Sequence, residues 1–210
     1  MAGTIQEFVV ARNIRFMMHF TRVSNLANIL QHGLVPRDVL IRQDLGEYND
    51  MYRYDNTNAV CLSIQFPNYK MFWGVREENK DKNIDWVVLV IRPEVLWTLP
   101  CAFCVTNAAS ATVRSVPLDE RRDLAALERM YADWEGKNRD MLGIPANFPT
   151  NPQAEVLMLN GVPRQYISSV IVLTIAKQQE LQAQFPGLHV HVHAGTFRYR
   201  QDYAHWKKEN

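Results

Sequence analysis

Two polar side chains with a possible chemical use stand at the start of an apolar run late in the chain. Gln153 and Glu155 flank one alanine, follow the turn-rich segment 147–152 and precede the apolar residues 156–159. Residues two apart on a strand point to the same face, so these two side chains are predicted to project together. A carboxylate stabilises positive charge that develops on a sugar ring, and a neighbouring amide can read the acceptor. The simpler alternative is an edge strand with two solvated polar residues.

The composition is that of an ordinary globular protein. Of 210 residues, 47% are hydrophobic and 21% are charged, which argues against long disordered segments. The length suits one substantial core, so we expect a single domain over residues 1–210. Because the formal net charge is only +1, any contact with nucleic acid must come from a local patch.

The cysteines and the N-terminus predict a cytoplasmic protein. Cys61, Cys101 and Cys104 form a sparse, odd set, which is typical of a reducing compartment. The N-terminus lacks a basic segment followed by a sustained apolar stretch, so a secretory signal is not expected. No run in the sequence approaches the roughly 20 apolar residues of a membrane helix.

Strands outnumber helices in the expected order of elements, which predicts an α+β domain built on mostly antiparallel sheets. An unbroken apolar strand is expected at 86–91 and an amphipathic helix at 118–134. Ser24 is expected to cap a helix that stops at Gly33, and Asn68 to cap a short aromatic helix. The segment 35–58 has little periodicity and is predicted to be a loop that covers a ligand. Further strands are expected at 14–20, 59–66, 102–106, 154–159, 167–174 and 188–193, with helical segments at 93–96 and 177–184.

Two groups of possible metal ligands have a simpler interpretation. Cys101 and Cys104 have the spacing of a zinc knuckle or a redox pair, but no second pair follows to complete four ligands. On a strand their thiols would point to opposite faces, so buried packing is the better account. His189, His191 and His193 alternate with valine, which is typical of a half-solvated strand near a sheet edge. A metal-dependent hydrolase that uses these histidines stays as an alternative.

Several common catalytic motifs are missing from the sequence. It contains no G-x-S-x-G elbow of a serine hydrolase, no G-x-G-x-x-G fingerprint and no G-x-x-x-x-G-K loop. A nucleotide, if one binds, must therefore be held by the rules of another fold.

Four segments taken together carry a resemblance to a known family. They are residues 19–34, 63–73, 102–107 and 153–157. In kind and order they resemble the DarT family of DNA ADP-ribosyltransferase toxins, and they span nearly the whole chain. The resemblance implies a compact transferase fold related to the poly-ADP-ribose polymerases. It also implies transfer of ADP-ribose from NAD, as co-substrate, to a base in single-stranded DNA, with no metal involved.

The resemblance assigns catalytic roles to two residues. Glu155 matches the family's catalytic glutamate, which would orient a ribose hydroxyl and stabilise the cationic sugar as nicotinamide departs. Arg53 is the best match to an arginine that meets phosphate or assists proton transfer.

The same resemblance places a set of residues at the cofactor. His19 matches the histidine that holds the ribose and amide end of NAD. Thr21 follows it closely enough to share the site, and Asn28 lies on the helix side. An aromatic face for nicotinamide would come from the helix after Asn68, with Tyr69, Phe72 or Trp73 as candidates.

The acceptor is less well determined by the resemblance. The sequence around Arg53 departs from the thymidine-modifying members, and segments 66–72 and 106–110 favour the branch that modifies guanine. Guanine is therefore expected ahead of thymine as the target base. Single-stranded DNA is bound by stacking aromatics and basic groups, and Tyr48, Phe148 and Gln153 are expected to contact it.

Two alternatives stay open, one with another substrate and one without catalysis. The same fold could modify RNA or a protein side chain, because a glutamine two residues before the glutamate also occurs in protein-modifying transferases. The chain could instead be a non-catalytic nucleic-acid or protein-binding module in which Glu155 is merely exposed. The resemblance itself implies the toxin of a toxin–antitoxin pair, neutralised by a macrodomain-type antitoxin like DarG.

Overall fold

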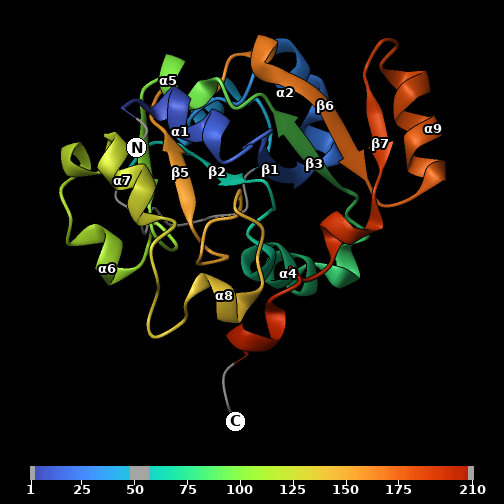
Figure 1. Ribbon diagram of the computed structural model, residues 1–210. Coiled ribbons are helices and arrows are strands. Elements are labelled where there is room, and N and C mark those ends of the chain that lie inside the picture. Colours follow the sequence, from blue (N-terminus) through green and yellow to red (C-terminus); the bar gives the residue numbers. More distant parts are fainter. Residues whose placement is uncertain (1–2, 48–56, 208–210) are drawn as a thin grey trace.

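The computed structural model describes residues 3–47 and 57–207 of the chain (Figure 1). Within these residues the centre of the fold is a seven-stranded sheet in the order β4-β5-β2-β1-β3-β6-β7. Every neighbouring pair is antiparallel except β6 and β7, which are parallel. The predicted α+β class with a mostly antiparallel sheet is confirmed. The strands are β1 (Met17–Arg22), β2 (Val60–Ile64), β3 (Trp86–Ile91), β4 (Cys101–Cys104), β5 (Glu155–Met158), β6 (Ile167–Val172) and β7 (Val190–Val192).

Strand β2 joins two halves of this sheet. Only two residue pairs, Met17 with Ile64 and Met18 with Ser63, connect it to β1. The rest of β2, residues 60–62, pairs with β5 instead. β1 meanwhile pairs with β3 along its whole length. Because each strand is committed to a different neighbour, β1 and β2 separate beyond Met18.

One face of the sheet carries the main hydrophobic core. Side chains from all seven strands meet five helices there, and Leu62 and Leu89 at its centre are fully buried. Alternation along each strand sends the neighbouring residues to the opposite face. That second face is covered by α4 against β1 and β3, and by α6 against β4 and β5. The helices of the main core are α1 (Ile5–Ala11), α2 (Leu26–His32), α5 (Val95–Thr98), α7 (Leu124–Arg129) and α9 (Ile175–Gln184); those of the second face are α4 (Tyr69–Glu78) and α6 (Ala111–Arg114).

The remaining helical elements are short. None of the helices in the described residues is long and apolar enough to cross a membrane. The remaining elements are the helices α3 (Arg37–Gln43) and α8 (Arg139–Leu142), with 3-10 turns η1 (Val23–Asn25), η2 (Lys80–Lys82), η3 (Leu118–Arg121), η4 (Arg164–Tyr166), η5 (Ala194–Phe197) and η6 (Tyr203–Trp206).

Local capping chemistry sets the helix ends, and one predicted cap is wrong. Asn68 caps α4 as predicted, because its Oδ1 accepts a hydrogen bond from the Met71 N–H at 3.2 Å. Ser24 does not cap α2, because it lies inside η1, which runs directly into that helix. α2 ends before Gly33 as predicted, where a backbone φ of +79° suits glycine.

Two longer predictions are replaced by shorter elements. The helix expected at 118–134 is η3 followed by α7, because Asp123 adopts an extended backbone and caps α7 by accepting from the Ala126 N–H at 2.8 Å. The loop expected at 35–58 contains α3, which begins after Pro36. The other predicted strands are present, with ends shifted by a few residues.

The cysteines and the C-terminal histidines occupy structural positions. Cys101 and Cys104 are buried on opposite faces of β4, as predicted. His191 is exposed on β7, an edge strand, and His193 Nδ1 accepts from the Thr196 N–H at 3.2 Å to cap η5. Among residues 3–47 and 57–207, no three His, Cys, Asp or Glu side chains are grouped so that they could hold a metal ion.

A backbone bridge ties the end of α2 to the turn after β5. Leu34 donates to the Val162 carbonyl at 2.8 Å, and Val162 donates back to the Leu34 carbonyl at 2.7 Å. Gly33 and Gly161 flank the bridge, and a Cβ on Gly161 would lie 2.2 Å from the Leu34 carbonyl oxygen. The close approach of these two segments of the chain therefore requires glycine.

We expect Gly161→Ala to destabilise the protein more than Gly136→Ala. The two glycines have similar φ values, +78° and +76°. Both variants therefore carry the roughly 1–2 kcal/mol cost of a side chain in left-handed geometry. Open space surrounds Gly136, whereas the new Cβ at 161 meets a backbone carbonyl. That contact should add about 1–3 kcal/mol. Urea unfolding measures the difference, and equal free energies of unfolding would contradict the bridge.

Candidate functional site

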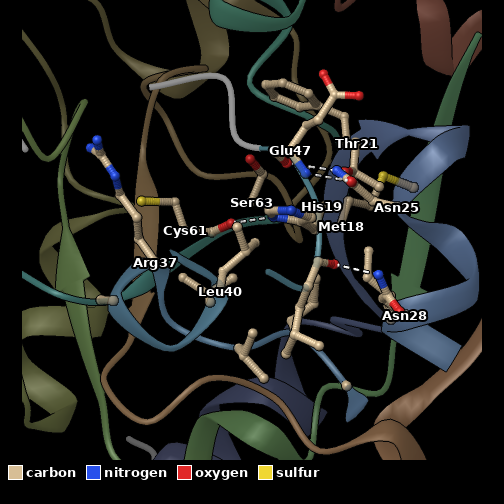
Figure 2. Close-up of a pocket in the computed structure, with 18 of the residues that line it drawn as sticks. Met18, His19, Thr21, Asn25, Asn28, Arg37, Leu40, Glu47, Cys61 and Ser63 are labelled. Carbon is tan, nitrogen blue, oxygen red and sulfur yellow. Dashed lines mark hydrogen bonds between the residues drawn. The ribbon is translucent and has the colours of Figure 1, made fainter. Parts of the chain in front are cut away.

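A cavity of about 220 Å³ lies where β1 and β2 separate (Figure 2). Residues 18–21 of β1 form one wall, and β2 with the residues just before it forms another. α2, α3 and the segment around Glu47 contribute further walls. Asn68 reaches the cavity from the start of α4, and Glu155 reaches it from β5 in the other half of the sheet. The cavity is therefore built from both halves of the sheet and closed by the first helices.

His19 stands at the point of separation. Its Nδ1 lies 2.9 Å from the carbonyl oxygen of Cys61, so the imidazole bridges strands whose backbones no longer pair (Figure 2). A carbonyl only accepts, so Nδ1 carries the hydrogen and Nε2 is an acceptor in the neutral ring. Burial lowers the pKa of His19 below its ordinary value, and the bond to the Cys61 carbonyl opposes this in part. The ring is thus neutral at pH 7 and can accept from a ligand hydroxyl or amide.

Asn25 fixes the segment that closes one side of the cavity. Its Oδ1 accepts from the Glu47 N–H at 2.8 Å, and its Nδ2 donates to the Glu47 carbonyl at 2.7 Å and to Thr21 Oγ1 at 3.0 Å. Gly46 passes so close that a Cβ there would lie 2.5 Å from Asn25 Oδ1. Arg22 adds an ion pair with the Glu47 carboxylate. One buried amide therefore anchors the chain at Glu47.

Glu155 begins β5 and is held by three N–H groups. Its Oε1 accepts from Asn68 Nδ2 at 3.1 Å and from Asn107 Nδ2 at 3.5 Å, and its Oε2 accepts from the Ala108 N–H at 2.8 Å. The side chain is only 4% exposed, yet it lines the cavity. Asn107 and Ala108 arrive because Cys104 of β4 pairs with Glu155 and the chain then turns over the carboxylate. The carboxylate is thus oriented by two separate elements and aimed at the cavity.

The C-terminal segment holds the loop that precedes β5. Arg200 is 4% exposed and donates to the carbonyls of Pro149 and Thr150, each at 2.8 Å. Its guanidinium also forms two hydrogen bonds with Asp202, which is 2% exposed. Arg139 adds a bond to the Phe148 carbonyl at 2.8 Å. Removing one member of the buried Arg200–Asp202 pair would leave an uncompensated charge, so the two residues hold the loop as a unit.

A sequence model of a known protein family matches most of the chain. The sequence model described as ssDNA thymidine ADP-ribosyltransferase, DarT, matches residues 18–197. The chain belongs to the DarT family. The match covers β1 through η5 and includes both His19 and Glu155. No match was found among curated proteins.

Solved DarT structures share the fold at low sequence identity. Thermus sp. 2.9 DarT in complex with carba-NAD+ is 15% identical with a TM-score of 0.59, over 88% of this chain and 98% of that one. The same protein in complex with ADP-ribosylated ssDNA is 15% identical with a TM-score of 0.52, over 89% and 97%. Thermosipho africanus DarTG in complex with ADP-ribose is 15% identical with a TM-score of 0.59, over 87% of this chain. The chain spans about half of that protein, 51% of its length.

Three of the residues that the sequence assigned to the cofactor line the cavity of this DarT-family chain. They are His19, Thr21 and Asn28. Thr21 is buried and its Oγ1 is bonded to Asn25, while Asn28 Nδ2 donates to the Leu45 carbonyl at 2.7 Å (Figure 2). Both side chains thus hold the cavity wall as well as facing it.

None of the three aromatic residues expected to stack on nicotinamide, Tyr69, Phe72 and Trp73, lines the cavity. Phe72 is 1% exposed and stacks on Phe20 with ring centroids 4.5 Å apart. Tyr69 is 2% exposed and its edge meets Tyr199. Neither lines the cavity, whereas Met71 between them does. Successive helix residues point about 100° apart, so α4 turns Tyr69 and Phe72 into packing and Met71 towards the site, while Trp73 is 50% exposed.

The residues expected to contact the acceptor lie outside this cavity or outside the described structure. Gln153 precedes β5 in a turn, so the prediction that it shares a strand face with Glu155 is wrong. Its N–H donates to Asn151 Oδ1 at 2.9 Å, which fixes that turn. The Phe148 ring lies 6.2 Å from that of Phe66, and neither Phe148 nor Gln153 lines the cavity. Arg53 and Tyr48 are outside the described residues, and their roles stay predictions.

Sequence reasoning missed the amides that organise the site. Asn68 was predicted only as a helix cap, yet its Nδ2 also binds Glu155 while its Oδ1 caps α4. Asn107 lies in a segment that supported the family resemblance, without a role of its own. Asn25 gave no signal beyond its place near a helix start, because its two bonds to Glu47 join it to backbone atoms 22 residues away.

We expect acid to destabilise the protein in part through His19. Because its folded-state pKa is lowered, the unfolded chain binds more protons, so stability is complete above about pH 6.5 and declines as the pH falls towards the folded-state pKa. In His19→Gln this part of the decline should disappear. Urea unfolding between pH 7 and 5 measures it, with His191→Gln, which removes an exposed imidazole, as the matched control. An unchanged slope in His19→Gln would contradict a buried neutral ring.

Proposed function

We propose that the chain transfers ADP-ribose from NAD to a base in single-stranded DNA. The observation that carries this proposal is the Glu155 carboxylate, fixed by three N–H donors at the edge of a cavity that His19 also lines. Membership of the DarT family supports the reaction class. Thermus sp. 2.9 DarT in complex with carba-NAD+ supports NAD as the co-substrate.

In this proposal His19 and Glu155 act at the two sides of the nicotinamide ribose. His19 Nε2 accepts a hydrogen bond from a ribose hydroxyl or from the carboxamide, which the neutral ring permits. Glu155 accepts from a second ribose hydroxyl and stabilises the sugar cation. The C–N bond to nicotinamide breaks, and the electron pair leaves with nicotinamide.

A nitrogen of the DNA base then attacks the anomeric carbon and forms the new C–N bond. The proton of that nitrogen must leave, and Glu155, which lines the cavity, is proposed to take it up. Arg53 would assist this step or meet phosphate, as the family resemblance implies. The products are the ADP-ribosylated base, nicotinamide and one proton.

The acceptor base is the finer part of the proposal. The sequence departures around Arg53 favour guanine, and the description of the matched family model names thymidine, which is the second candidate. Tyr48, Phe148 and Gln153 are proposed to contact the base and its neighbours. Oligonucleotides that each lack one base type, analysed by mass spectrometry after reaction with NAD, decide between guanine and thymidine.

We further propose that the chain is the toxin of a toxin–antitoxin pair and acts in the cytoplasm. Thermosipho africanus DarTG, of which this chain spans 51%, supports a paired partner. The partner is proposed to be a macrodomain-type antitoxin like DarG. Induced expression should arrest growth, and co-expression of a macrodomain ADP-ribosyl hydrolase should restore it.

Glu155→Gln is expected to lower transfer by about 100-fold or more, because the neutral amide neither stabilises the sugar cation nor takes up a proton. Glu120→Gln, which changes an exposed glutamate in η3, should leave transfer unchanged. Nicotinamide release and the mass of the labelled oligonucleotide measure both variants.

The same assay separates the proposed reaction from its alternatives. Nicotinamide release with no DNA adduct, but with adducts on RNA or protein, would move the acceptor. A wild-type protein that neither releases nicotinamide nor forms any adduct would contradict the enzyme and favour a binding module.

A further inference from the structure

Three aromatic rings and three lysines form a surface at the C-terminal end of the described chain, which we call the C-terminal aromatic surface. Figure 1 shows this segment passing beside α4 and α8. Its members are Tyr199, Tyr203, Trp206, Lys70, Lys137 and Lys207.

The rings of this surface are stacked and accessible. Tyr199 is 43% exposed and stacks on Tyr203, with centroids 3.9 Å apart and an interplanar angle of 9°. Trp206 is partly exposed, and its indole Nε1 donates to Asp202 Oδ2 at 2.6 Å, which fixes the ring. Large exposed rings held rigid in this way are unusual in a packing role, because most packed rings are buried.

Two of the three rings, Trp206 and Tyr203, have lysines beside them. Lys70 and Lys137 lie 5.7 and 5.4 Å from the Trp206 ring centre, and Lys207 lies 5.0 Å from that of Tyr203. The acidic side chain beneath, Asp202, is buried and paired with Arg200, so it does not offset the lysines at the surface. Rings for stacking next to cations for phosphate are the two components of a single-stranded nucleic-acid platform.

The surface begins within one helical turn of Asn68, the residue that binds the Glu155 carboxylate. Three consecutive residues at the start of α4 make the connection: Asn68 binds Glu155 at 3.1 Å, Tyr69 meets Tyr199 and Tyr203 edge-on, and Lys70 donates to the Trp206 carbonyl at 3.2 Å. Three residues of a helix span only about 5 Å along its axis. The loop before β5 joins the same region, because Arg200 binds that loop and Asp202 together.

We propose that the C-terminal aromatic surface binds the nucleotides that flank the target base of a single-stranded DNA substrate. The inference rests on the proposed function, and it assigns the binding of the strand outside the catalytic cavity. Bases stack on the exposed tyrosine face, and Lys137 and Lys207 meet the backbone phosphates. The target nucleotide itself is held at Glu155 and does not need this surface.

Affinity for single strands in the absence of NAD tests the stacking. Tyr199→Ala should weaken binding of an oligonucleotide of about 16 nucleotides roughly tenfold, because one stacked base is lost. An oligonucleotide of about 4 nucleotides, which fills only the catalytic site, should bind equally to the variant and the wild type. Fluorescence anisotropy measures both.

The salt dependence tests the charges. In Lys137→Gln/Lys207→Gln the slope of log affinity against log salt should fall by about 1.4, since each phosphate neutralised on a single strand contributes about 0.7. Lys80→Gln/Lys82→Gln makes the same change in charge at the far end of α4 and should leave the slope unchanged.

Turnover separates the surface from a general loss of structure. With the long oligonucleotide the variants should raise KM and keep kcat, while transfer to the short oligonucleotide stays at the wild-type level. Long-strand binding equal to the wild type in both variants, with transfer intact, would overturn the surface and leave the proposed function standing. If both variants bind the long strand more weakly than the wild type, but the wild type transfers no ADP-ribose, the surface stands and the proposed function is overturned. Equal losses on long and short strands would also overturn the surface, because the substituted residues would then not act on the flanking nucleotides in particular.

Discussion

The separation of β1 from β2 is the constraint on which the rest of the structure depends. β1 uses its full length to pair with β3, and β2 uses most of its length to pair with β5, so only two residue pairs are left between them. Backbone groups freed by such a separation need other partners. The imidazole of His19 supplies one by donating to the Cys61 carbonyl. His19 therefore bridges the two separated strands and also lines the cavity between them, where its ring can meet a ligand.

Around this opening, asparagine side chains hold in place elements that no backbone pairing of the sheet connects. Asn25 holds the segment at Glu47, and Asn68 holds Glu155 while capping α4. Each of these side chains is buried and makes bonds in two directions. An amide carries both donors and an acceptor, so it can join two elements whose backbones have no ladder between them. The precision of the site comes from these short links between elements.

The C-terminal segment extends this organisation away from the cavity. Arg200 holds the loop that leads into β5, and Asp202 connects that arginine to Trp206. The loop that presents Glu155 and the exposed rings are therefore parts of one hydrogen-bonded unit. A change at the buried Arg200–Asp202 pair would move both together, whereas changes at the exposed rings and lysines reach only the surface.

The sequence by itself determined the class of fold, most of the strands, the cap at Asn68 and the candidate pair His19 and Glu155. The fold class, the strands and the cap follow from patterns within a few residues, such as unbroken apolar runs and cap residues. The pair His19 and Glu155 follows from the resemblance to a known family. Only the tertiary structure decided that Gln153 lies in a turn before the strand, that Tyr69 and Phe72 turn into packing, and that Asn25, Asn68 and Asn107 organise the site. The physical reason is distance along the chain. Asn68 and Glu155 are 87 residues apart and meet only because α4 covers the face of the sheet to which the Glu155 side chain of β5 points, which no local pattern encodes.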